Sequence, residues 1–453
     1  MVTHISDFTI YGSSWTTPET AELFSETGLV RGWLEVMTVL AEVQAEHGLI
    51  PVEAARGIRS TFENLVVDEE FLAEAGEDFR KTNHSLVGLI KAMQNRCGEP
   101  GGEWLCYGAT VHDITDTQMC RTLVAVLDLF VKRIIQVEKD LVKLALEHKD
   151  TAMCGRTHGQ IGLPITFGYK AATWLDEFER HRQRLCEMRA RLAVGQLAGG
   201  VGSLSSLGPQ AEAIQKAFCE KLNLSPPPIS WTTTRDRYAE WLNNLALIAA
   251  SGDRIGQEIY NLQRPEINEV AEGFISGTVG SITMPQKRNP EISEHLGTLS
   301  RLVRHHAAWM MENLVHDHER DGRSWKGEWL ILPECSLVAD KMLALLQSLL
   351  PNLAVRKDRM QENLAGTNGM IYAEAVMLKL SARMGKQTAH RYVYDCAMRA
   401  HETGRHLKKV LAADADISKW LSPAELDECF ELDNSVGHCS AMVERIVAGI
   451  DLR

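Results

Sequence analysis

The distribution of proline is the feature that most constrains how this chain can fold. Proline inside a helix removes a backbone hydrogen bond and clashes with the preceding turn, so long helices form where proline is absent. The 453 residues include only 14 prolines, and these leave five long clear stretches: 101–163, 165–208, 229–264, 291–332 and 352–422. These stretches are the places where we expect long helices.

Apolar residues inside these stretches recur every three or four positions, which is the period of one helix face. The stripes are Leu123, Leu127, Phe130, Ile134, Val137, Leu141 and Leu144; Leu175, Phe178, Leu185, Met188 and Leu192; and Trp241, Leu245, Ile248, Gly252, Ile255, Ile259 and Leu262. A helix of about 30 residues is about 45 Å long, which is more than one small domain can cover. The pattern therefore predicts a mainly helical protein that associates with copies of itself.

Breaks in this pattern suggest where the domains end. A Gly/Pro cluster at 97–102 closes a first unit, and Pro351 follows the last long-helix region. We expect an N-terminal helical domain at 1–110, a central long-helix bundle at 111–352, and a C-terminal helical domain at 353–453.

Composition excludes several classes of function. The net charge of −12 argues against a general nucleic-acid binder or a binder of anionic membranes, because both need a basic face. The ten cysteines are scattered without a C-x-x-C pair, which favours reduced thiols over disulfides or a zinc site. The first residues do not resemble a signal peptide, and no apolar run reaches the roughly 18 residues of a membrane helix. We expect a soluble, cytoplasmic protein.

The strongest local motif is the segment 273–290. Glycines at positions 273, 277 and 280 permit large backbone changes, which suit a mobile lid. Ser281 and Lys287 lie close to a helix start that Asn289 would cap and Pro290 would open, and this combination can bind and process an anion. On composition alone, a flexible surface loop that enters a helix explains the segment equally well.

Further candidate side chains come from three short segments, 81–85, 108–117 and 155–160. They place hydroxyl, amide and imidazole groups near expected helix ends, where such groups bind carboxylates or transfer protons. Taken alone, each is also compatible with an ordinary polar residue at a helix boundary. The candidates in chain order are Asn83, His84, Thr110, Thr157 and His158.

Two other motifs do not fit a cofactor or a metal. The glycine-rich run at 200–205 lacks the third glycine of a dinucleotide fingerprint, and the run at 316–319 is not the H-E-x-x-H of a zinc protease. We therefore expect neither a cofactor nor a metal.

Together these segments resemble the fumarase/aspartase superfamily. The signature loop of that family, G-S-x-x-M-P-x-K-x-N-P, is matched by Gly280, Ser281, Met284, Pro285, Lys287, Asn289 and Pro290. The segments 110–113, 155–160 and 363–374 also look like family elements, so the resemblance covers nearly the whole chain. It implies an all-α fold of three helical domains whose central bundle joins four copies into a homotetramer. Each active site would combine segments from three subunits.

The resemblance also implies a chemistry, the anti β-elimination of fumarate from a small dicarboxylate-containing substrate. Ser281 would be the base that removes the proton next to a carboxylate, which produces an aci-carboxylate intermediate. Lys287 and Asn289 would bind that carboxylate as its negative charge builds. His158 would protonate the leaving group. The remaining implied substrate contacts are Asn83, His84, Thr110, Thr157, Thr234 and Arg235.

Two branches of the family look most similar to the chain, the adenylosuccinate lyases and the bacterial 3-carboxy-cis,cis-muconate cycloisomerases. Adenylosuccinate lyases hold the nucleotide phosphate with serines and an arginine where Trp325, Lys326 and Trp329 stand here. We therefore expect C–N bond cleavage in an N-substituted aspartate that lacks a nucleotide phosphate. The cycloisomerase, the adenylosuccinate lyase and a non-catalytic structural oligomer remain as alternatives.

Overall fold

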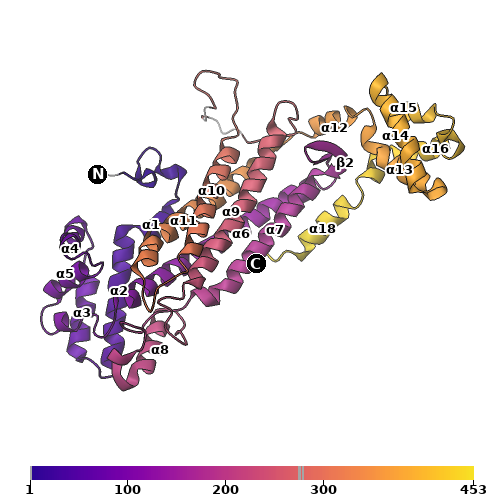
Figure 1. The fold of residues 1–453 in the computed structure, drawn as a ribbon. Coiled ribbons are helices and arrows are strands. Elements are labelled where there is room, and N and C mark those ends of the chain that lie inside the picture. The colour runs from indigo at the N-terminus through magenta and orange to yellow at the C-terminus, as the bar shows by residue number, and fades with distance from the viewer. Residues whose placement is uncertain (1–2, 274–276, 278–279, 453) are drawn as a thin grey trace. The chain divides into compact units, whose positions relative to one another are not determined.

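Helices dominate the computed structural model, which describes residues 3–273, 277 and 280–452 (Figure 1). The expectation of an all-α fold is confirmed. Residues 274–276, 278 and 279 of the predicted signature loop lie outside the described residues. Within the described part of the chain, no helix combines the length and the apolar composition that crossing a membrane requires.

The chain forms two compact units. The first contains Met1–Arg133, His181–Ala250 and Thr298–Ala344, and the second contains Ile134–Arg180, Ser251–Gly297 and Leu345–Arg453. The division into three domains at 110/111 and 352/353 stays a prediction.

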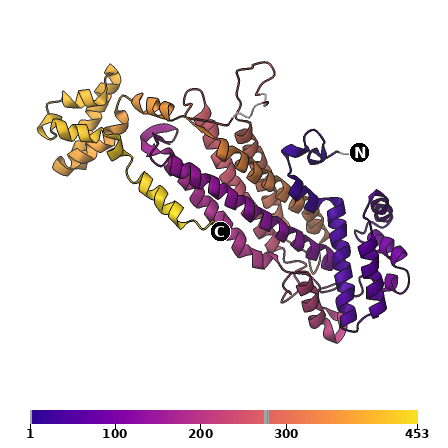
Figure 2. The same ribbon diagram turned by 180° about the vertical axis from the view of Figure 1, so that it is seen from behind.

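Five long helices contribute residues to both units. They lie side by side within each unit in both views (Figures 1 and 2). Their bounds are α6 (Val111–Glu147), α7 (Phe167–Leu192), α9 (Asp236–Gln263), α10 (Glu291–Glu312) and α11 (Gly322–Leu349).

Shorter helices complete each unit. Those of the first unit are α1 (Pro18–Phe24), α2 (Glu26–Glu46), α3 (Val52–Asn64), α4 (Glu69–Thr82), α5 (Val87–Cys97) and α8 (Ala211–Lys221). Those of the second unit are α12 (Lys357–Ala365), α13 (Ala373–Met384), α14 (Lys386–Thr403), α15 (Leu407–Ala412), α16 (Pro423–Cys429), α17 (Leu432–Ser435) and α18 (Cys439–Gly449).

Two small antiparallel pairs of strands lie in the second unit. The strand β1 (Ala152–Thr157) pairs with β2 (Gln160–Thr166), and β3 (Val270–Ala271) pairs with β4 (Ala354–Val355). The sequence analysis did not predict the first pair, because it took His158 to lie at a helix boundary. The register of β1 against β2 shifts between Cys154 and Arg156, so the alternation that would reveal a strand is interrupted.

The long-helix stripes form the core, as their spacing predicts. Every member of the α6 stripe is buried, from Leu123 at 0% to Leu144 at 7% exposure, and Trp241 and Ile259 of α9 are fully buried. The chain therefore covers these stripes by itself, which differs from the expectation that they need partner copies. Other large apolar side chains stay exposed on the long helices of the first unit: Leu247, Trp309, Met311, Trp329 and Leu330.

Proline positions predict the helices well, with one exception. Pro333 lies inside α11 rather than at its boundary. The helix continues on both sides because its flanking residues, Ile331, Leu332 and Cys335, are buried in the core of the first unit. Tertiary packing therefore outweighs the local cost of the proline.

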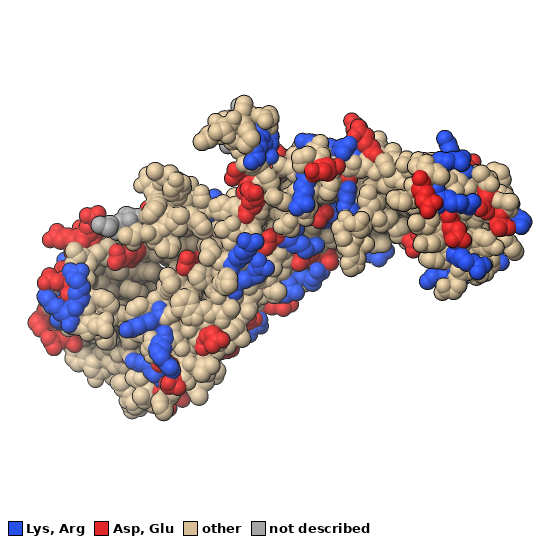
Figure 3. Space-filling model, turned by 45° about the horizontal axis from the view of Figure 1, so that its top comes forward, with Lys and Arg blue, Asp and Glu red and all other residues tan. Residues whose placement is uncertain are grey.

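Charged side chains are dispersed over the surface. Basic and acidic groups alternate on the face shown in Figure 3, and no single-sign field covers that face. Many of these groups form ion pairs across neighbouring helices of the second unit, such as Lys379 with Glu428 and Arg383 with Glu425.

Gly168 at the start of α7 allows the closest helix contact of the second unit, and this generates a stability prediction. An added Cβ would lie 2.4 Å from the Ala145 carbonyl oxygen and 2.5 Å from the Lys149 nitrogen, both backbone atoms at the end of α6. Gly168→Ala should lower the free energy of unfolding by about 1–3 kcal/mol, because backbone must move apart to admit the methyl group. Thermal and urea denaturation followed by circular dichroism measure this.

Gly57→Ala is the matched control. Gly57 lies within α3, and the only atom near an added Cβ is the Gly101 Cα at 3.9 Å. Its substitution should be neutral or should raise stability by up to about 1 kcal/mol through helix propensity. Equal loss of stability in the two variants would contradict the packing argument.

Candidate active site

The predicted proton donor lies at the tip of the β1–β2 hairpin. His158 and Gly159 form a two-residue turn in which both residues have positive φ, 52° and 75°, as tight hairpin turns require. Thr157 pairs with Gln160 across this turn, and both Thr157 and His158 are exposed. The hairpin therefore presents the hydroxyl and the imidazole to solvent from a short turn.

A buried carboxylate anchors this hairpin in the second unit. Arg156 donates to Glu269 from two nitrogens, at 2.9 Å and 2.8 Å, and the Glu269 side chain is fully buried. The Asn363 amide donates to the same carboxylate at 2.9 Å. This paired, bidentate arrangement fixes the base of the hairpin, and therefore the place from which His158 projects.

The predicted base lies in a tight turn that its own hydroxyl organises. Ser281 Oγ accepts the backbone N–H of Met284 at 3.0 Å and that of Thr283 at 3.4 Å. Two N–H donors that point at one oxygen favour its negatively charged form over the neutral hydroxyl. Gly280 permits this turn, because an added Cβ would lie 2.3 Å from the Lys287 carbonyl oxygen.

The two other loop candidates differ in their surroundings. Lys287 is exposed, whereas the Asn289 amide donates to the Gly280 carbonyl at 2.8 Å and so closes the base of the turn. Asn289 was expected to cap the next helix, and this is wrong. Glu272 takes that place by accepting the N–H groups of Ile292 and Ser293 at 3.1 Å and 2.7 Å. A carboxylate complements the positive end of α10 better than a neutral amide does.

A cavity of about 610 Å³ adjoins this part of the loop in the second unit. Its lining is mostly polar at the loop, with Glu272, Arg288 and Asn289, and continues to Gln263 and Arg356. The loop thus borders a space that is large enough for a small dicarboxylate.

Thr110 belongs to the first unit, where a buried carboxylate fixes its position. Asp113 accepts the backbone N–H groups of Thr110, Ala198 and Gly199 at 2.8–3.0 Å. Burial raises the pKa of Asp113 to about 7, although these three donors act in the opposite direction. The Thr110 hydroxyl accepts a hydrogen bond from Arg320 at 2.8 Å. Arg320 was not among the candidate site residues predicted from the sequence.

Arg235 is enclosed by two carboxylates. Its guanidinium is bidentate to Asp116, at 2.7 Å and 3.0 Å, and it also binds both oxygens of Glu328. All three side chains are at most 4% exposed. Trp231 and Tyr238 pack against the guanidinium, whose centre is 5.1 Å and 4.8 Å from their ring centroids. The guanidinium donors of Arg235 therefore bind groups of the protein. The neighbouring candidate Thr234 is exposed.

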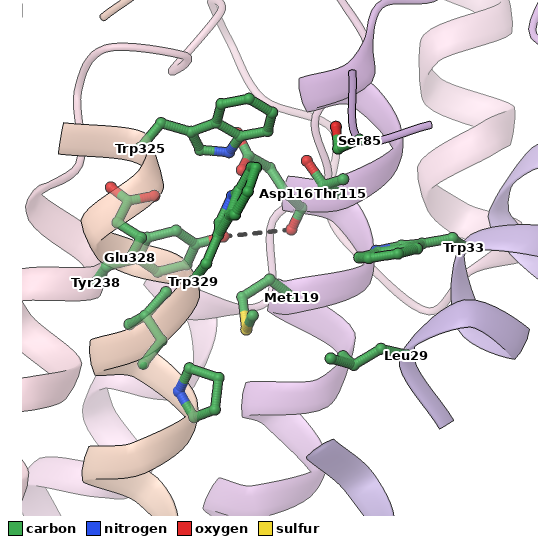
Figure 4. A pocket seen from close by; sticks show the side chains of 12 residues that line it. Leu29, Trp33, Ser85, Thr115, Asp116, Met119, Tyr238, Trp325, Glu328 and Trp329 are labelled. Atoms are coloured by element: carbon green, nitrogen blue, oxygen red, sulfur yellow. Dashed lines mark hydrogen bonds between the residues drawn. The ribbon is translucent and has the colours of Figure 1, made fainter. Parts of the chain in front are cut away.

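Asp116 and Glu328 of this ion cluster also line a second cavity, of about 190 Å³ (Figure 4). Trp325 and Trp329 of α11 form one side, Trp33 and Leu29 of α2 form the other, and Met119 of α6 lies between them. Ser85 also lines it, immediately after the candidates Asn83 and His84, which are exposed at the end of α4. Sequence reasoning named Trp325 and Trp329 but missed Trp33, Leu29 and Met119, because nothing local distinguishes them from core residues.

His112 connects Thr110 to this cavity. Its ring stacks on Trp325 with centroids 4.3 Å apart, it is 1% exposed, and its Nδ1 has no hydrogen-bond partner among the described residues. Burial lowers the pKa of His112 to about 4, aided by Arg235, Arg320 and His316 and opposed by Asp116. The ring is therefore neutral at physiological pH.

The structure assigns the sequence candidates to two groups. Asn83, His84, Thr110, Thr234 and Arg235 belong to the first unit, and Thr157, His158, Ser281, Lys287 and Asn289 belong to the second. Within the described residues, no cluster of histidine, cysteine, aspartate or glutamate could hold a metal ion.

Comparisons with known proteins place these features in context. A family described as "Lyase" matches residues 13–304, and one described as "Adenylosuccinate lyase C-terminus" matches residues 369–446. The N-acetyl-S-(2-succino)cysteine lyase of Dickeya dadantii is 37% identical over 451 residues, which cover 100% of this chain and 98% of that one. The adenylosuccinate lyase of Methanocaldococcus jannaschii is 35% identical over 95% of this chain and 93% of that one.

A solved structure extends the likeness to the fold. The fumarate lyase from Mesorhizobium sp. BNC1 superposes with a TM-score of 0.90 at 35% sequence identity, covering 97% of this chain and 100% of that one.

The buried His112 predicts a specific acid sensitivity. Its folded pKa of about 4 lies below the ordinary value of 6.5, so the unfolded chain binds a proton more readily. Stability is therefore lost as the pH falls from about 6.5 towards about 4. Between about pH 7.5 and about pH 5, wild type should lose about 2 kcal/mol more than His112→Gln does.

Chemical denaturation of both proteins at both pH values measures this difference. His401→Gln, at an exposed position of α14, is the matched control and should follow wild type. An identical pH response of wild type and His112→Gln would contradict the effect.

Proposed function

Because this chain belongs to the fumarase/aspartase superfamily and is a fumarate-releasing lyase, we propose that it acts on a small 2-substituted succinate. The substituent is linked through nitrogen or sulfur and carries no nucleotide phosphate. The reaction is an anti β-elimination through an aci-carboxylate intermediate, with Ser281 as the base and His158 as the acid.

The observation that carries this proposal is the turn around Ser281. A serine hydroxyl is a weak base, and its deprotonated form needs stabilisation before it can accept a proton from carbon. The N–H groups of Thr283 and Met284 supply such stabilisation at the hydroxyl oxygen. Lys287, six residues further along the same loop, supplies a positive charge for the substrate carboxylate.

The proposed step balances as follows. Ser281 takes the proton from the carbon next to a carboxylate, and the electron pair moves into that carboxylate, where Lys287 and Asn289 stabilise it. The pair then forms the carbon–carbon double bond as the bond to nitrogen or sulfur breaks. His158 gives the leaving atom its proton, and fumarate and a free amine or thiol depart.

The linking atom is inferred from the relatives. The Dickeya enzyme is named for a thioether of succinate and the Methanocaldococcus enzyme for a succinylated amine, and both are similar to nearly the whole of this chain. Both names contain a succinyl group, and the first places sulfur on its carbon 2. A phosphate is excluded from the proposal because Trp325 and Trp329 offer no charge to bind it, and Lys326 between them does not line the cavity.

This proposal predicts turnover that depends on Ser281. Purified protein should release fumarate from S-(2-succino) or N-(2-succino) compounds, followed by the absorbance of the fumarate double bond. Ser281→Ala should reduce kcat at least about 10³-fold, because the proton-accepting group is removed, while the circular dichroism spectrum is unchanged. Ser205→Ala, in another glycine-rich segment, is the control and should retain activity.

Two results would overturn the assignment. Full activity in Ser281→Ala would remove that residue as the base. Turnover of 3-carboxymuconate, without turnover of any succinyl amine or thioether, would identify a cycloisomerase instead.

We further propose that the protein is a homotetramer whose active sites are each shared by three subunits. The exposed Trp309 and Met311 of α10, together with Leu247 of α9, are apolar surface that a second copy would cover. The loop that carries Ser281 also exposes Ile282 to 97%, a large apolar side chain that a partner surface would cover.

If each active site is shared between subunits, two inactive variants should restore activity when they assemble into mixed oligomers. Ser281→Ala and His158→Gln should each be inactive as pure proteins. If the two residues of one site come from different subunits, co-expressed mixtures should recover about one quarter of wild-type activity, the statistical share of intact sites. The fumarate assay measures this recovery, and size-exclusion chromatography with light scattering measures the mass of the assembly.

A second mixture serves as the control. Ser281 and Lys287 belong to one loop, so Ser281→Ala mixed with Lys287→Ala should not recover activity. Failure of the first mixture, in oligomers shown to contain both variants, would place Ser281 and His158 of each site on one subunit.

A further inference from the structure

The cavity of the first unit has a mainly apolar lining. Its walls are the indoles of Trp33, Trp325 and Trp329, together with Leu29, Met119 and Pro333. None of the residues that line it is a lysine, an arginine or a histidine. A phosphate or carboxylate placed there would lose its hydration without gaining a cationic partner.

The charges nearest to the cavity also disfavour an anion. Asp116 and Glu328 lie in its wall, and Arg235 is the one cation that binds both of them. The ion cluster therefore carries a net charge of −1 when both carboxylates are ionised. All four carboxylate oxygens already accept hydrogen bonds from Arg235, so a cationic ligand would find no oxygen without a partner.

The size of the cavity limits its occupant. It measures about 190 Å³, whereas pockets for drug-sized ligands measure about 300–1,000 Å³ and a dry cavity of about 150 Å³ holds benzene. One six-membered ring or one branched alkyl group fits, and a nucleoside does not fit within it.

The surroundings of the cavity connect it to the candidate substrate contacts of the first unit. Ser85 in its wall follows His84, and Trp325 packs on His112, two residues after Thr110. We infer that this cavity binds the substituent of the succinyl substrate, and that this substituent is an uncharged aromatic or branched apolar group. This inference rests on the proposed function at one point: it assumes that the group in the cavity is part of a 2-substituted succinate.

Binding of analogues that cannot undergo elimination tests this inference apart from catalysis. The probes are 2-benzylsuccinate, 2-(phosphonomethyl)succinate and 2-(2-aminoethyl)succinate, which differ in the charge of the substituent. Isothermal titration calorimetry on the full-length wild-type protein should show benzylsuccinate binding at least about tenfold more tightly than either other probe, because only its ring gains from burial.

Variants of the wall should reverse this preference. Trp329→Arg places a cation at a position that is 42% exposed, and Trp325→Ser removes one indole face. Each should weaken benzylsuccinate at least about tenfold, and Trp329→Arg should strengthen the phosphonate probe. Trp420→Phe, in the second unit, is the matched control and should leave all three affinities unchanged.

The outcomes separate this inference from the proposed function. The inference of an apolar occupant would be overturned by equal affinities for the three probes or by tighter binding of a charged probe. It would also be overturned if both wall variants kept the wild-type preference. A preference for benzylsuccinate, with no turnover of S-benzyl or N-benzyl succinates, would support the cavity and count against the elimination.

Discussion

The ion cluster of Asp116, Arg235 and Glu328 is the interaction on which the first unit depends. It joins α6, the segment that leads into α9, and α11 at one buried point. Two carboxylates on one guanidinium satisfy its donors, and removal of any member would leave a charge buried without its partner. Asp116 and Glu328 also line the tryptophan-walled cavity, so the ion cluster helps to fix the position of those walls.

The second unit uses carboxylates in a comparable way. Glu269 and Glu272 flank the two-residue strand β3. Glu269 binds Arg156 at the base of the His158 hairpin, and Glu272 caps the helix that follows the Ser281 loop. One short segment therefore fixes the starting points of both proposed catalytic elements. Since each carboxylate has several donors, the hairpin and the helix start are held in position without a large hydrophobic contact.

Much of the helical fold could be predicted from the sequence. The features that could not be predicted were missed for physical reasons. The helix stripes from Leu123 to Leu144 were predictable because their period is local and all of them are buried. The hairpin of His158 was not, because its bulge breaks the alternation of a strand. Arg235 and Asp116 are 119 residues apart, and no local pattern reveals that they pair. The capping role of Glu272 was missed for the same reason, since the N–H groups it accepts come 20 and 21 residues later.

The Ser281 loop and the tryptophan-lined cavity are different parts of the chain, and we propose that they bind different parts of the substrate. In the proposed elimination, Lys287 of the Ser281 loop would supply positive charge at a carboxylate, and backbone N–H groups of the same loop bind the Ser281 hydroxyl. The group that leaves needs a proton, which we assign to His158, and a shaped space, which we assign to the tryptophan-lined cavity. Because the cavity residues are not those of the loop, substitutions in the walls could change which substituent binds while the proton-transfer groups stay unchanged. Such independence would allow relatives that are each about one-third identical to this chain to carry the names N-acetyl-S-(2-succino)cysteine lyase and adenylosuccinate lyase.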